Sequence, residues 1–380
     1  MTERKIGKGT QLVEGGRRKA WRGRLVNPPI ERASTILFDS TAEMESGAPA
    51  LGEYRYGLQG TATHWALSEA LTELEPGAAG TALFSSGLAA ITSALLALLK
   101  PGDELLAPDN VYGPTRKFCG TMLKRFGVAT RYYDPMALPE IGDQTRVIFL
   151  ESPGSLTMEV QDVPAIAALA RERGIVTLID NTWATPLLFP AIAAGVDVAM
   201  LAATKYVAGH ADLLLGTLTA TPDHFERLQH TAWDLGHAVS PDDAWLASRG
   251  LRTMGVRLKQ HEEGALKVAH WLKEQPEVGL VLHPALPDCP GHEIWKRDFK
   301  GASGLFSFEL KQGDPARLVD ELKLFGIGYS WGGYESLAMI ATPYRTVSVP
   351  PVSRLVRLHI GLEDPDDLIA DLAAALKASR

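Results

Sequence analysis

The sequence contains little cysteine and no run of apolar residues long enough to cross a membrane. Its only cysteines, Cys119 and Cys289, lie far apart and form no Cys-x-x-Cys pair, so we expect neither a disulfide framework nor a zinc cluster. The N-terminus also lacks the apolar core of a signal peptide. Together these absences favour a reducing compartment, and we expect a cytoplasmic protein with no membrane partner and no metal.

Basic residues are fewer than acidic ones, and the formal net charge is -7. This balance argues against a nucleic-acid partner. The exception is a basic segment, RRKAWRGR over residues 17–24. Two interpretations of it remain open: a solvated or subunit-spanning arm, which we favour, and an anion-binding tail.

What the sequence does contain is an alternation of apolar strand-like segments and helical patterns up to about residue 245. Because the chain has 380 residues, two domains are the natural expectation. Strands that are apolar throughout are typical of an α/β fold with a mostly parallel sheet covered by helices on both faces. The predicted strands are 81–84, 103–108, 146–150, 175–179 and 197–203, and the predicted helices are 63–74, 88–99 and 163–174.

The pattern changes after residue 245. A long helical stretch is predicted from Ala244 toward Glu274, and shorter strand-like and helical segments follow, with a last helix from Pro365. We therefore predict a large α/β domain over 61–245 and a small α+β domain over 246–380.

Two reactive side chains follow predicted strands. Asp180 comes just after IVTLI, and Lys205 comes directly after the strand that ends near residue 203. Ligands of parallel sheets bind at the carboxyl ends of strands, and a lysine near an apolar core has a lowered pKa and can act as an amine nucleophile. Taken alone, Asp180 could equally cap a helix, and a surface lysine would be the commoner interpretation of Lys205.

Two further segments could bind anions. SSGLAA (85–90) lies between a strand and a long helix, whose N-terminus offers free N–H groups, although a plain cap and turn explains it equally well. Arg357 alternates with apolar neighbours in a predicted strand, so it needs a carboxylate from the protein or from a substrate. An anion cradle, an acid, an amine and a carboxylate receptor together are what an enzyme dependent on pyridoxal 5'-phosphate (PLP) requires.

Several long motifs occur in an order that is specific to one family. The chain resembles the Cys/Met-metabolism family of PLP enzymes, and within it the bacterial cystathionine β-lyases, from about Tyr56 to the C-terminus. This resemblance implies fold type I, the aspartate aminotransferase-like fold of PLP-dependent transferases. The motifs that carry it are ESPGSLTMEV (151–160), IDNTWATP (179–186), AATKYVAGHAD (202–212), SRGLRTMGVRLKQHEE (248–263), HPALP (283–287), GHEIWKRDFKGASGLFSFEL (291–310), YSWGGYESL (329–337) and RLHIGLEDPDDLIADL (357–372).

The resemblance also implies roles for individual residues. Lys205 would bind the cofactor covalently, Asp180 would pair with its pyridine nitrogen, and Tyr112 would stack on its ring. Arg357, helped by Ser330, would bind the substrate carboxylate. The residues expected to hold the cofactor phosphate are Ser86, Gly87, Leu88 and Thr204.

One expected contribution comes from another subunit. By resemblance, residues 1–60 would form an arm whose Tyr56 enters the active site of a neighbouring chain. This implies an obligate homo-oligomer, a tetramer built of dimers that share active sites.

Three positions depart from the family pattern. Ala202 stands where many relatives have serine, and Trp233 stands where close relatives have tyrosine. Leu58, in YRYGLQGT, stands where β-lyases have an arginine that contacts the cofactor phosphate. Losing that contact costs on the order of 1.5–3 kcal/mol unless Arg55 or Gln59 replaces it, so we expect weakened or redistributed PLP binding.

The activity implied is a carbon–sulfur β-lyase of methionine biosynthesis, which cleaves L-cystathionine or a related cysteine S-conjugate to homocysteine or another thiol, pyruvate and ammonia. The γ-acting relatives typically read ESPTNP where this chain has ESPGSL, and they tend to have a smaller residue than Trp331, whose indole would narrow the pocket. The alternatives are a γ-lyase or γ-synthase, and a PLP-binding regulatory protein without turnover.

Overall fold

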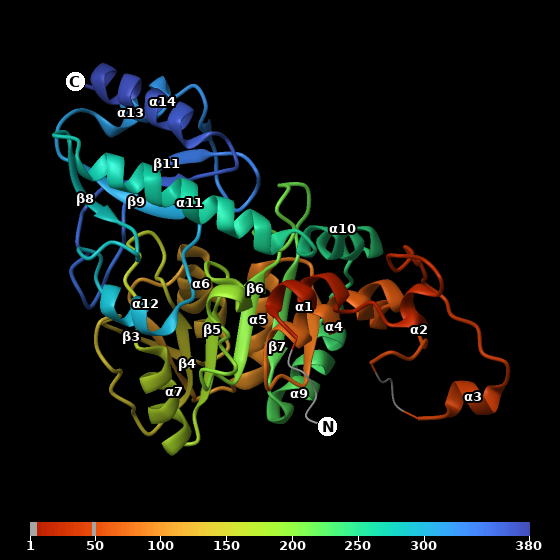
Figure 1. Ribbon diagram of the computed structural model, residues 1–380. Helices are drawn as coiled ribbons and strands as arrows, with labels where there is room; N and C mark the ends of the chain where they lie inside the picture. Colours follow the sequence, from red (N-terminus) through yellow and green to blue (C-terminus); the bar gives the residue numbers. More distant parts are fainter. Residues whose placement is uncertain (1–5, 48–50) are drawn as a thin grey trace.

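The computed structural model describes residues 6–47 and 51–380. Figure 1 shows a larger and a smaller sheet, each accompanied by helices, with the N-terminal segment at one side of the larger sheet. Within these residues, none of the helices combines the length and the apolar character needed to cross a bilayer. The division of the chain at residues 60 and 245 remains a prediction.

The larger sheet has seven strands: β1 (Gly80–Phe84), β2 (Glu104–Pro108), β3 (Ala129–Tyr133), β4 (Thr145–Glu151), β5 (Val176–Asp180), β6 (Val198–Ala202) and β7 (Gly216–Ala220). Their order is β1-β7-β6-β5-β4-β2-β3. The pairs from β3 to β6 are parallel, whereas β7 runs antiparallel to both β6 and β1. The sheet is mixed and mostly parallel, which agrees with the predicted fold class.

Helices cover both faces of this sheet. α4 (Ala62–Leu74) and α7 (Val163–Glu172) contribute to the apolar cluster on one face, and α5 (Gly87–Leu98) and α9 (Pro222–Asp234) to the cluster on the other. Leu178 and Ile179 are neighbours in β5 and belong to opposite clusters, because successive side chains of a strand point to opposite faces. Burial on both faces explains why these strands are apolar throughout.

The smaller sheet has five strands: β8 (Val278–Leu282), β9 (Leu305–Leu310), β10 (Gly326–Ile327), β11 (Leu337–Ala341) and β12 (Leu355–His359). Helices α11 (Met254–Lys273), α13 (Pro315–Glu321) and α14 (Pro365–Ala378) share its apolar cluster, and α12 (His292–Asp298) lies between β8 and β9 in the chain. The strand order in this sheet is β10-β11-β12-β9-β8. β12 is therefore a central strand, and this strand carries Arg357.

The prediction of a single helical stretch from Ala244 toward Glu274 is wrong in one respect. It consists of two helices, α10 (Pro241–Leu251) and α11, with a break at residues 252–253. The Gly250 carbonyl accepts a hydrogen bond from Arg257 Nη2 at 2.8 Å. A Cβ atom at Gly250 would lie 2.2 Å from the Ala208 carbonyl oxygen, so the end of α10 packs directly on the backbone that follows Lys205.

The N-terminal segment packs on α4 through α1 (Lys8–Glu14) and α2 (Lys19–Arg22). The ring of Trp21 lies 5.4 Å from that of Trp65 in α4. Arg18, in the basic segment 17–24, forms an ion pair with Glu69 of α4. α3 (Thr41–Glu45) stands away from both sheets, at the right of Figure 1.

Candidate active site

A cavity of about 230 Å³ lies at the carboxyl edge of the larger sheet, where β4, β5 and β6 end. Parallel sheets bind their ligands at this edge. Most of the site residues predicted from the sequence line it: Ser86, Gly87, Leu88, Tyr112, Asp180, Thr204, Lys205, Trp331 and Arg357.

Two carboxyl groups end neighbouring strands beside this cavity. Glu151 of β4 and Asp180 of β5 are partners in the strand register. Burial raises the pKa of both groups, and the charge of Asp180 raises that of Glu151 further. At Asp180 the rise in pKa is opposed by hydrogen bonds from Thr182, whose N–H lies 3.0 Å from Oδ1, and by the charge of Lys205. The pKa of Glu151 is therefore raised further than that of Asp180, and Asp180 is the more readily ionised member of the pair.

Lys205 follows β6 and extends its amine toward the segment that precedes β11. Its Nζ donates a hydrogen bond to Ser330 Oγ and lies 5.2 Å from the centroid of the Trp331 ring. Burial, and next the positive charge of Arg357, lower the pKa of Lys205 to about 8, against the opposing effect of Asp180. Part of the population is therefore uncharged near neutral pH, and the uncharged amine is the nucleophilic form.

Arg357 lies across the cavity on β12. Its Nη2 donates to the Ser330 carbonyl oxygen at 2.9 Å, so Ser330 contacts both cations of the site. Ser330 has a φ of 79°, a value that side chains other than glycine rarely adopt. Burial lowers the pKa of Arg357 to about 10, which leaves it charged at neutral pH.

Tyr112 lies at the start of α6 (Gly113–Phe118), with its backbone N–H donating to Glu151 Oε2 at 2.7 Å. Burial and the two nearby carboxyl groups raise the pKa of the Tyr112 hydroxyl, so it stays protonated at neutral pH. Glu151 was not among the residues predicted from the sequence. The segment RVIFLE ends in an acid just as IVTLID does, so the rule that found Asp180 could have found Glu151.

The start of α5 forms another wall of the cavity. Ser86 caps this helix, and its Oγ accepts from the Ala89 N–H at 3.1 Å. A Cβ atom at Gly87 would lie 2.7 Å from Cβ of Ala202, so only glycine allows the helix to begin this close to the end of β6. The Thr204 hydroxyl accepts from the Leu215 N–H at 2.9 Å.

The remaining predicted residues lie elsewhere in the chain. Tyr56 is 52% exposed and does not line the cavity. Leu58, Gln59 and Trp233 line a separate, much smaller pocket. The guanidinium of Arg55 donates to the Glu43, Met44 and Ser46 carbonyl oxygens at the end of α3.

Comparison with known proteins identifies the family. Residues 9–377 match the Cys/Met metabolism PLP-dependent enzyme family. The chain belongs to this family. It is 46% identical to "Cystathionine beta-lyase MetC" of Escherichia coli over 96% of this chain and 97% of that protein, and 44% identical to "Cystathionine beta-lyase" of Salmonella typhimurium over 98% of each. The crystal structure of metB from Corynebacterium glutamicum superposes with a TM-score of 0.90 at 31% identity, covering 98% of each chain.

The cofactor of this PLP-dependent family fits the residues present. Asp180 is a half-buried carboxylate that could pair with a protonated pyridine nitrogen, and Lys205 is a half-buried amine of lowered pKa that could bind an aldehyde. The N-terminus of α5 offers free N–H groups to a phosphate, and Gly87 leaves no side chain in the way. Fold type I and the cofactor PLP, both predicted from the sequence, are confirmed by the family match and the structural neighbour.

Proposed function

We propose that this family member is a carbon–sulfur β-lyase that cleaves L-cystathionine, or a related cysteine S-conjugate, to homocysteine or another thiol, pyruvate and ammonia. One observation carries the proposal: Asp180, Lys205 and Arg357 line a single cavity although they come from both sheets. The relatives named cystathionine β-lyase, which match this chain over almost its full length, support the choice of reaction.

The substrate is bound by its amino-acid head. Arg357, held by Ser330, binds the α-carboxylate, and its charge has a hydrogen bond to a backbone carbonyl but none to a carboxylate among the described residues. PLP, when bound, would supply an electron-withdrawing pyridine ring that stabilises negative charge at the substrate α-carbon. Asp180 would hold the ring nitrogen in its protonated form.

Proton transfer is assigned to two groups. The Lys205 amine takes the proton from the α-carbon, and a pKa of about 8 suits a base that works near neutral pH. As the Cβ–S bond breaks, the sulfur receives a proton from Lys205 or from the Tyr112 hydroxyl. Water then converts the remaining three-carbon enamine to pyruvate and ammonia.

The finer features of the proposal rest on the family resemblance. Ser86, Gly87, Leu88 and Thr204 would hold the cofactor phosphate, and Tyr56 would reach the site of a neighbouring chain in a homotetramer. The indole of Trp331, which lines the cavity, would narrow it against γ-cleavage. Two buried free thiols agree with the cytoplasm, where a role in methionine biosynthesis would place the enzyme.

The substitution Lys205→Ala tests the assignment. It should reduce pyruvate formation from L-cystathionine to a trace, whereas Lys124→Ala, which removes an exposed amine, should leave it unchanged. A Lys205→Ala enzyme that kept a substantial rate would refute the role of Lys205. Formation of α-ketobutyrate by the unaltered enzyme would instead favour a γ-acting relative.

A further inference from the structure

The wall of the cavity that follows β4 has an unusual backbone. Leu156 and Met158 have φ values of 67° and 59°, a region that residues other than glycine rarely adopt, and both line the cavity. The loop is wound tightly, since the Gly154 N–H donates to the Glu159 carbonyl oxygen at 2.9 Å and the Met158 N–H to the Gly154 carbonyl oxygen at 3.1 Å. We call residues 153–158 the wall loop.

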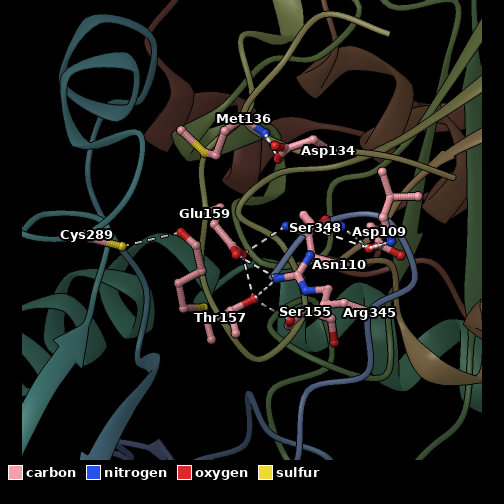
Figure 2. A network of polar contacts seen from close by, with 12 residues as sticks. Asp109, Asn110, Asp134, Met136, Ser155, Thr157, Glu159, Cys289, Arg345 and Ser348 are labelled. Carbon is pink, nitrogen blue, oxygen red and sulfur yellow. Dashed lines mark hydrogen bonds and ion pairs between the residues drawn. The ribbon is translucent and has the colours of Figure 1, made fainter. Parts of the chain in front are cut away.

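A buried polar network joins the wall loop to Glu159, Asn110 and Arg345, and Figure 2 shows these residues with their hydrogen bonds. Thr157 lies between the two residues of positive φ, and its hydroxyl donates to Glu159 Oε2 at 2.5 Å. Arg345 Nη2 donates to both Thr157 Oγ1 and Glu159 Oε1, each at 2.6 Å. Asn110 Nδ2 donates to Glu159 Oε2 at 3.0 Å. The side chains of Arg345 and Glu159 are only 3% and 5% exposed, so water does not compete for these bonds.

Arg345 reaches this network from a connection between two strands of the smaller sheet. It belongs to the connection between β11 and β12, and β12 carries Arg357. The same connection is fixed to the larger sheet at Asp109, whose Oδ2 accepts from the N–H groups of Thr346 at 2.8 Å and Val347 at 2.7 Å. The wall loop is therefore joined through Arg345 to the connection that leads into β12, whereas Arg357 itself is held separately, by the Ser330 carbonyl.

We propose that Thr157, Glu159 and Arg345 are positioning residues that set the shape of the wall loop and thereby select which thioether side chains the enzyme accepts. The inference rests on the proposed function. The wall loop contributes backbone and apolar or hydroxyl side chains to the cavity but no charge, whereas the amino-acid head is bound by Arg357 and Lys205. A change in the wall loop should therefore alter recognition of the thioether chain and leave the head group bound as before.

The substitution Thr157→Val tests this, because it removes the hydroxyl while the Arg345–Glu159 pair stays intact. Thr145→Val is the matched control: Thr145 is equally buried, its hydroxyl donates to Glu104 Oε1 at 2.7 Å, and it lies at the opposite end of β4. The ratio of kcat/KM for L-cystathionine to kcat/KM for S-methyl-L-cysteine should change at least fivefold in Thr157→Val and less than twofold in Thr145→Val. Thr157→Ser, which restores the hydroxyl, should restore the ratio.

Amide hydrogen exchange of the PLP-loaded enzyme supplies a measurement that needs no substrate. The segment 153–159 should exchange at least fivefold faster in Thr157→Val and at the original rate in Thr145→Val and Thr157→Ser. The proposal is overturned if either the kcat/KM ratio or the exchange in Thr157→Val stays within twofold of the unaltered enzyme. If the unaltered enzyme forms no pyruvate from either substrate, the proposed function fails, and the exchange rates alone then decide whether Thr157 holds the wall loop.

Discussion

His359 offers a sharp test of how Lys205 and Arg357, the two cations of the proposed active site, are held. This side chain, at the end of β12, is fully buried. Its Nε2 accepts from the Gly332 N–H at 3.1 Å, and its Nδ1 donates to the Glu335 carbonyl oxygen at 3.1 Å. Burial holds the pKa of His359 well below its ordinary value, so the ring is neutral and Nε2 keeps its lone pair. The imidazole therefore fixes residues 332–335, and Ser330 lies just before this segment.

That segment touches Lys205, the proposed catalytic lysine, directly. A Cβ atom at Gly332 would lie 3.1 Å from Cα of Lys205, and Ser330 bonds to both Lys205 and Arg357. The substitution His359→Leu would leave the buried Gly332 N–H and the part-buried Glu335 carbonyl without partners, at about 1–3 kcal/mol for the N–H and no more than that for the carbonyl. We expect the free energy of unfolding to fall by about 1–6 kcal/mol. KM for L-cystathionine should rise at least about tenfold, because Arg357, the proposed carboxylate receptor, shifts with Ser330.

Urea unfolding of the PLP-loaded enzyme and steady-state kinetics measure the two effects. The control is His359→Gln, whose side-chain carbonyl can still accept from Gly332, so about half of the loss in stability should return. An unfolding free energy for His359→Leu within about 0.5 kcal/mol of the original, with KM unchanged, would refute the reasoning.

Three further predictions concern the cofactor and the pocket. PLP capture by the apoenzyme should accelerate with pH around a midpoint near 8, because deprotonation makes the Lys205 amine nucleophilic; a midpoint above about 9.5 in stopped-flow absorbance would contradict the lowered pKa. Leu58→Arg should tighten PLP binding roughly tenfold in equilibrium dialysis, because it supplies a cation for the cofactor phosphate. Arg55 does not supply that cation here, since its guanidinium is bonded to carbonyl groups at the end of α3. An unchanged affinity would show that the phosphate site needs no further positive charge. Trp331→Ala should raise the share of α-ketobutyrate among the keto acids formed from L-cystathionine, and an unchanged share would count against a narrowing role of the indole.

Local pattern was sufficient to predict the parts of the fold and site that depend on buried strands. Asp180 and Lys205 could be placed at the carboxyl edge because each follows an apolar segment of strand length, and the structure brings them to one cavity. β7 was not predicted, because GTLTA combines glycine and threonine and lacks a strong apolar signal.

Contacts between distant segments could not be predicted in this way. Arg345 and Glu159 are 186 residues apart, and nothing in either neighbourhood marks them as partners. The break between α10 and α11 similarly depends on the Arg257 guanidinium reaching the Gly250 carbonyl and on close packing against Ala208. That Glu151 and Asp180 are partners in the strand register is likewise defined only by the fold, although each acid could be found from the apolar segment before it.

The most direct test of the central claim is the identity of the keto acid that the PLP-loaded enzyme forms from L-cystathionine. The account predicts pyruvate, released together with homocysteine in equal amounts. Release of α-ketobutyrate with cysteine, or the absence of any keto acid, would contradict it.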